Sequence, residues 1–309
     1  MIKLFIITIL LAAANILYGQ QNCVPDYASI IKRVSLNDSV NIAYIEKGTG
    51  KTIVFIHGLG GNLSHWQKSI IQLSKKYRCI AIDLPGYGCS PLKNTVTSDD
   101  QLNNYANIII KFFDKLKLKE ITLVGHSMGG QIAIITALKL PSKIKKLVLL
   151  APAGFETFTT NEKELLAKIS TPEFFKDQNE IVIRTSFKNN FYEQPADAEA
   201  LIQYRIDLKK CSAFDNYCTT IVNGINGILN HPVQSQLANI KQKVLLIFGE
   251  EDKLIPNKYL HPTLTTLQVA NNGAKLIKNS SLVMIPKAGH LLQYEMPDAF
   301  NSAVINFLK

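Results

Sequence analysis

A serine flanked by glycines stands at the junction of an apolar run and a helical run. The motif GHSMG (125–129) follows the apolar residues 121–125 and precedes residues 129–140, whose composition predicts a helix. Glycines at these places allow a sharp turn that presents the serine hydroxyl in the open. The start of a helix also places partial positive charge beside an oxyanion that forms there. The motif therefore predicts that Ser127 is a nucleophile in acyl transfer.

A serine hydroxyl attacks only when a base removes its proton, and six histidines are present. His290 follows the predicted strand 281–285, at the end of a strand where α/β proteins build their sites. His57 also ends a strand, but it precedes a glycine-rich loop that we expect it to brace. His126 is expected to pack beneath the serine. We therefore expect His290 to be the general base.

The imidazole needs a carboxylate that fixes its tautomer and stabilises its charged form. Three acids, Glu250, Glu251 and Asp252, directly follow the predicted strand 244–248. Asp252 is our preferred candidate, and Glu251 remains the alternative because they are neighbours in the chain.

Two backbone N–H groups are candidates for binding the oxyanion. One belongs to Met128, directly after the nucleophile, and the other to Leu59 in the loop HGLGG (57–61). That loop matches neither of the glycine patterns that bind phosphates. No spacing of histidines, cysteines and acids predicts a metal site, so we expect neither a cofactor nor a metal.

Strand-like and helix-like runs alternate along the chain, which is typical of a parallel sheet covered by helices on both faces. We expect strands at 30–36, 40–46, 52–57, 79–83, 121–125, 145–151, 244–248 and 281–285, the first two antiparallel, and helices at 65–75, 100–116, 129–140, 258–269 and 297–308. About 92 residues separate the strands ending at 151 and starting at 244, whereas a crossover unit needs roughly 30. The surplus predicts an inserted helical cap, with helical stretches at 162–169 and 196–210. The expected units are a core domain of 21–154 and 233–309 and a cap of 155–232.

Composition excludes several classes of protein. The chain has 309 residues, of which 47% are hydrophobic and 19% charged, so it is neither disordered nor a disulfide-dense miniprotein. The net charge of +10 comes mainly from scattered lysines, with no run of five or six basic residues. We therefore expect no nucleic-acid partner. The sequence does not indicate an oligomeric state.

The N-terminus resembles an export signal. Lys3 precedes fourteen mostly apolar residues, 4–17, which are too few for a membrane span of about 20. We expect residues 1–20 to be a signal peptide and the protein to be exported, periplasmic or secreted, with an uncleaved N-terminal membrane anchor as the alternative. In an oxidising compartment Cys211–Cys218 and Cys79–Cys89 are possible disulfides.

From about residue 30 to the end, the sequence resembles the α/β-hydrolase fold superfamily, in its capped, lipase/esterase-like branch. The shared blocks are HGLGG (57–61) with Trp66 after it, DLPGYGCS (83–90), GHSMGG (125–130), LIFGEED (246–252) and AGH (288–290). The resemblance implies a mostly parallel eight-stranded sheet with the cap between strands six and seven. It also supports Asp252 over Glu251, and the chain order Ser127, Asp252, His290 is that of the superfamily's catalytic triads.

The function predicted from these residues is hydrolysis of small carboxylic esters through an acyl-enzyme on Ser127. The resemblance leaves one enzymatic alternative, a carbon–carbon bond hydrolase of ring-cleavage products, for which Arg184 or Arg205 could bind the substrate carboxylate. A non-catalytic ligand-binding relative is a remote alternative. Among the cap aromatics, Phe174 and Phe175 are the candidates for binding the acyl chain.

Overall fold

One sheet organises the protein. The structure is a computed structural model that describes residues 25–37, 39–90, 92 and 100–309, so the predicted signal peptide lies outside the described residues. The strands are β1 (Lys32–Ser35), β2 (Asn41–Lys47), β3 (Thr52–Ile56), β4 (Arg78–Ile82), β5 (Ile121–His126), β6 (Ile144–Leu150), β7 (Lys243–Gly249) and β8 (Ser280–Ile285). They lie in the order β1-β2-β4-β3-β5-β6-β7-β8. Only β2 pairs antiparallel, with β1 and β4, and every other pair is parallel. The predicted eight-stranded, mostly parallel sheet is confirmed.

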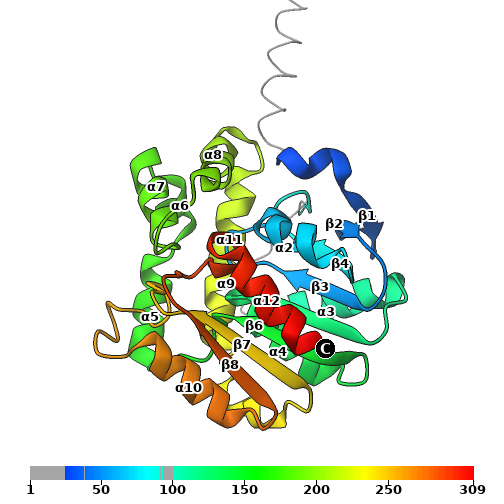
Figure 1. Ribbon diagram of the computed structural model, residues 1–309. Coiled ribbons are helices and arrows are strands. Elements are labelled where there is room, and N and C mark those ends of the chain that lie inside the picture. The colour runs from blue at the N-terminus through cyan, green and yellow to red at the C-terminus, as the bar shows by residue number, and fades with distance from the viewer. Residues whose placement is uncertain (1–24, 38, 91, 93–99) are drawn as a thin grey trace, which may run out of the picture.

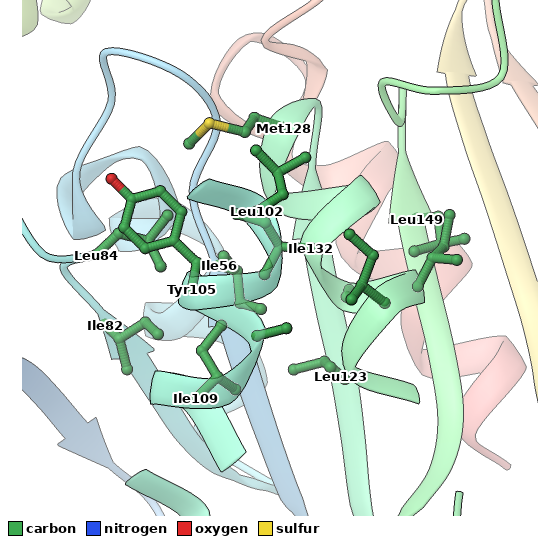
Figure 2. Packing of buried hydrophobic residues seen from close by; sticks show 14 of the residues in the cluster. Ile56, Ile82, Leu84, Leu102, Tyr105, Ile109, Leu123, Met128, Ile132 and Leu149 are labelled. Atoms are coloured by element: carbon green, nitrogen blue, oxygen red, sulfur yellow. The ribbon is translucent and has the colours of Figure 1, made fainter. Parts of the chain in front are cut away.

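Helices cover both faces of this sheet because its central strands are apolar on both sides. In β3, Ile53 and Phe55 belong to one buried cluster, and Val54 and Ile56 belong to another. The helices α2 (Gln67–Leu73), α11 (Leu292–Glu295) and α12 (Pro297–Leu308) pack on the first cluster, and α3 (Gln101–Lys115), α4 (Met128–Lys139) and α10 (Thr266–Leu276) pack on the second (Figure 1). Figure 2 shows part of the second cluster, where α3 and α4 meet the sheet.

A helical insert separates β6 from β7, as the resemblance implies. It contains α5 (Thr160–Ile169), α6 (Pro172–Lys176), α7 (Glu180–Lys188), α8 (Glu199–Asp207) and α9 (Phe214–Asn230). Short 3₁₀ helices complete the described elements, namely η1 (Asp26–Ile30), η2 (Leu63–Trp66), η3 (Ala196–Ala198), η4 (Leu208–Lys210) and η5 (Gln234–Asn239). Phe214, Tyr217 and Ile221 of α9 belong to the same buried cluster as α3 and α4. The insert is therefore anchored on the core through α9.

The bounds of the helix expected at 258–269 are wrong, because that helix is α10 at Thr266–Leu276. Residues 250–265 are described and contain no α-helix, and α10 begins only at Thr266. Pro262 interrupts the expected helix because proline lacks an N–H and disfavours helical backbone in the residue before it. Thr265 and Gln268 then form a capping box that fixes the actual start. The long loop that results carries Asp252.

Neither of the two possible disulfides, Cys211–Cys218 and Cys79–Cys89, is present. Cys211 is disulfide-bonded, whereas Cys79, Cys89 and Cys218 are buried free thiols. Because α9 begins at Phe214, Cys218 lies one turn inside a helix and packs in the core. Cys79, on β4, faces the other cluster of the sheet.

Candidate active site

Ser127 occupies a sharp turn between β5 and α4. Its φ of 53° and ψ of −120° lie outside the regions that L-residues ordinarily adopt. The glycines on either side are needed for close approach: a Cβ on Gly129 would lie 2.4 Å from the carbonyl oxygens of Ile56 and His57, and one on Gly125 would lie 2.3 Å from the oxygen of Gly129. The close packing of these backbone segments holds the strained turn in place. Ser127 remains partly exposed on the wall of a cavity.

A buried carboxylate holds His290. Asp252 Oδ2 lies 2.7 Å from His290 Nδ1. Asp252 Oδ1 accepts hydrogen bonds from the backbone N–H groups of Leu254 (2.8 Å) and Ile255 (3.0 Å). The neighbouring Glu251 is exposed, whereas Asp252 is buried. Of the two acids that the sequence left open, the structure brings only Asp252 to the histidine.

His126 also supports His290, in a way that the sequence did not indicate. We expected it to pack beneath the serine, but its ring lies against the His290 ring, with centroids 4.7 Å apart. Its Nε2 lies 2.9 Å from the carbonyl oxygen of His290 and donates to it. Burial lowers the pKa of His126 well below its ordinary value, which keeps this ring neutral.

The two candidate oxyanion donors are positioned by different elements. Met128 is the first residue of α4, where backbone N–H groups have no acceptor within the helix, and its side chain packs in the buried cluster (Figure 2). Leu59 lies in the loop after β3 and lines the cavity.

The loop that carries Leu59 is fixed on two sides. His57 Nε2 accepts the N–H of Leu84 (3.0 Å), so its Nδ1 donates to the carbonyl of Gly58 (2.8 Å). Burial lowers the pKa of His57 to about 4, and the neutral ring braces the loop as expected. From the insert, the Tyr217 hydroxyl donates to the carbonyl of Gly60 at 3.0 Å.

A cavity of about 430 Å³ opens at Ser127 and His290, between the core loops and the insert. Its apolar lining includes Leu59, Pro152, Phe158, Ile228, Leu254 and Leu291, and its polar lining includes Glu156, Ser186, Asn189, Asn190 and Asn257. No lysine or arginine is among the described residues that line it. A second cavity of similar volume, between η1 and α8, contains none of the triad candidates.

Phe174 and Phe175, the predicted acyl-binding residues, do not line this cavity. Phe174 is 53% exposed on α6, and Phe175 packs against the buried cluster that α9 shares with the core. Sequence reasoning instead missed residues that follow β6 and β7, such as Pro152 and Leu254. Their position beyond the carboxyl ends of parallel strands is the signal that could have found them; nothing comparable marks Asn190 or Ile228.

The described residues contain neither a candidate metal site nor a candidate membrane-spanning helix. Among the described residues, no group of three or more histidines, cysteines and acids could hold a metal ion. Within the same part of the chain, no helix combines the length and apolar character needed to cross a membrane.

Known proteins share this architecture. The chain is 28% identical over 290 residues to the uncharacterized hydrolase YugF of Bacillus subtilis, covering 91% of this chain and 98% of that protein. It is 27% identical over 281 residues to 2-hydroxy-6-oxononadienedioate/2-hydroxy-6-oxononatrienedioate hydrolase 1 of Pseudomonas putida, covering 87% and 92%. An esterase structure from Exiguobacterium antarcticum has the same fold, with a TM-score of 0.72 at 20% identity over 89% of this chain and 98% of that one. The sequence profile of the alpha/beta hydrolase fold matches residues 51–297, and the protein therefore belongs to the α/β-hydrolase fold family.

Proposed function

We propose that this protein hydrolyses carboxylic esters through an acyl-enzyme on Ser127. Asp252 holds the His290 ring with Nδ1 protonated, which leaves Nε2 free to accept the serine proton. The Ser127 oxygen attacks the ester carbonyl, and the N–H groups of Met128 and Leu59 bind the oxyanion.

In the remaining steps, His290 transfers one proton as the alcohol leaves and one as the acyl-enzyme is hydrolysed. His290 gives the serine proton to the departing alcohol, and the acyl group stays on Ser127. His290 then takes a proton from water, which attacks the acyl-enzyme, and gives that proton back to the Ser127 oxygen as the acid is released. The chemistry needs no group beyond these residues and water.

The charge of the cavity wall favours an ester over a ring-cleavage product. The Pseudomonas putida relative is named for dioate substrates, which carry two carboxylates, and burial of an anion requires a cationic partner. The described lining offers a glutamate and no lysine or arginine. Arg184 forms exposed ion pairs with Glu180 and Glu199, and Arg205 lies over the rings of Phe214 and Tyr217.

A direct comparison of substrates tests this proposal. Purified enzyme and the Ser127→Ala variant are assayed on p-nitrophenyl esters of graded chain length and on a vinylogous 1,5-diketone carboxylate. We expect ester hydrolysis that depends on Ser127 and a much smaller kcat/KM for the diketone. A larger kcat/KM for the diketone would establish the carbon–carbon hydrolase instead. Inertness to every substrate and to fluorophosphonate labelling would identify a non-catalytic relative.

We also propose that the protein acts outside the cytoplasm. The apolar residues 4–17 and the disulfide bond of Cys211 both support an oxidising compartment. Fractionation of the producing cells, with N-terminal sequencing of the product, distinguishes a cleaved exported protein from an anchored one. Full-length protein in the cytoplasmic fraction would refute the proposal.

A further inference from the structure

A buried carboxylate that the ester chemistry does not use lies in the cavity wall. Glu156 follows β6, and its side chain is only 7% exposed. The backbone N–H of Asn257 donates to both of its oxygens, at 2.9 and 3.0 Å, and His261 Nδ1 lies 2.5 Å from Oε1. Glu156 and Asn257 both line the cavity that contains Ser127. These contacts fix the carboxylate at the wall.

The charge of this carboxylate is not balanced by its surroundings. His261 also lies 3.3 Å from Glu162 through Nε2, so one imidazole serves two acids. The group of Glu156, Glu162 and His261 therefore has a net charge of −1 when the imidazole is protonated and −2 when it is neutral. The lysines of the same loop, Lys253 and Lys258, donate to backbone carbonyls and do not line the cavity.

An aromatic ring in the cavity wall also favours a cationic ligand over an anionic one. Phe158 lines the cavity and stacks on His261, with centroids 5.4 Å apart and an interplanar angle of 23°. The face of an aromatic ring attracts cations, quaternary ammonium groups included. A cation in the cavity would be attracted by Glu156 and by the ring of Phe158, whereas an anion would be repelled by the net negative charge of Glu156, Glu162 and His261.

Building on the ester hydrolysis proposed above, we propose that Glu156 determines the charge preference of the site. The enzyme hydrolyses esters whose buried portion is cationic or neutral and discriminates against esters whose buried portion carries a carboxylate. A unit charge about 6 Å from another, at an effective dielectric constant of about 20, changes an equilibrium by about a hundredfold before screening. We expect at least about a tenfold difference in kcat/KM between matched substrates.

Three p-nitrophenyl esters with the same three-methylene spacer test the acyl side. They are the 4-(trimethylammonio)butanoate, its neutral isostere 5,5-dimethylhexanoate, and the anionic monoester of glutaric acid. Acetylcholine and 3,3-dimethylbutyl acetate compare a cationic with a neutral alcohol group. Because burial raises the pKa of the Glu156 carboxyl, the assays are run at pH 8, well above the ordinary glutamate pKa of about 4.3. Wild-type kcat/KM should fall in the order cationic, neutral, anionic for the three p-nitrophenyl esters, or be higher for acetylcholine than for 3,3-dimethylbutyl acetate.

The variant Glu156→Gln removes the charge and keeps an acceptor for the N–H of Asn257. It should reduce the ratio of kcat/KM for the cationic ester to kcat/KM for the anionic ester at least tenfold. The matched control Glu164→Gln removes the same charge from an exposed side chain of α5 and should change nothing. If Glu156→Gln does not fold, the Glu162→Gln variant tests the inference instead. It lowers the negative charge of the group of Glu156, Glu162 and His261 without altering the cavity lining, and it should reduce the difference in kcat/KM between the cationic and anionic esters.

The inference is overturned if the wild type shows no charge order, or if the order survives in the folded Glu156→Gln variant. Either result leaves ester hydrolysis itself intact. Failure of the proposed function has a different signature, namely no hydrolysis of any ester and no fluorophosphonate labelling of Ser127.

Discussion

Replacement of Asp252 by asparagine should abolish most turnover while the fold persists. Oδ1 of Asp252 accepts two backbone N–H groups, and Oδ2 lies 2.7 Å from His290 Nδ1. In Asp252→Asn the remaining carbonyl oxygen must face the two N–H donors, because the amide nitrogen has no acceptor there. The amide NH₂ is thereby directed at His290 Nδ1, which can accept it only when the ring proton moves to Nε2.

That tautomer cannot take a proton from Ser127. In enzymes with this arrangement the same change lowers kcat by about 10⁴, equivalent to about 5 kcal/mol of transition-state stabilisation. The assay is kcat for a neutral p-nitrophenyl ester, with a thermal unfolding curve to establish that the variant is folded. Glu251→Gln, on an exposed neighbour, should retain kcat within about twofold. A folded Asp252→Asn variant that keeps a tenth of the wild-type kcat would refute the assigned role of Asp252.

Three other outcomes follow from the geometry. Ser127→Ala should remove fluorophosphonate labelling and leave only about 10³–10⁴-fold acceleration over water, and labelling that survives would place the nucleophile elsewhere. Burial lowers the pKa of His57 to about 4, so the unfolded chain is protonated first as the pH falls, and His57 should contribute a loss of up to about 3 kcal/mol in the free energy of unfolding between pH 6.5 and 4. His65 and His126, whose pKa values burial also lowers, act in the same direction, so His57→Gln, compared by denaturant titration, should show a smaller fall than the wild type, and an equal fall would refute the role of His57. Ile228→Ala removes side-chain volume from the cavity wall and should increase the length of acyl chain that the enzyme accepts, whereas Phe174→Ala and Phe175→Ala should not. Each methylene that becomes buried contributes about 0.8 kcal/mol to binding. An unchanged chain-length profile for Ile228→Ala would show that α9 does not limit the length of the acyl chain.

The order of strands and helices could be predicted closely because the pattern is strong and local. The closing helix was expected at 297–308 and is α12, Pro297–Leu308. The strands of the sheet agree to within a few residues, since each is an apolar run ended by glycine, proline or polar residues. The prediction failed at 258–269, where composition favours a helix and Pro262 opposes it. The capping box that begins at Thr265, three residues after Pro262, determines the start of α10. Both of these local signals are present in the sequence.

The triad candidates could be predicted for a related reason. Ser127, Asp252 and His290 each follow the end of a parallel strand, and parallel strands bring their carboxyl ends to one edge of the sheet. Their positions along the chain therefore imply proximity in space before any packing is known. The choice between Asp252 and Glu251 is different, because adjacent residues point in different directions and only the path of the loop determines which one reaches the histidine.

The lining of the cavity could not be predicted in the same way. The phenylalanines of the insert were interpreted by hydrophobicity, but an apolar side chain in a helical cap can pack on the core, line a cavity or remain exposed with the same local pattern. Phe175 packs on the core and Phe174 is exposed, because α6 lies against α9 rather than over Ser127. Glu156 shows the opposite case: an acid after a strand looks like a surface residue, and only the fold of the 250–265 loop brings Asn257 and His261 to it. The candidate catalytic residues of this chain therefore lie at the ends of strands and can be found from the sequence. The lining of the substrate cavity depends on how the insert between β6 and β7 and the 250–265 loop pack on the core, which no local sequence pattern specifies.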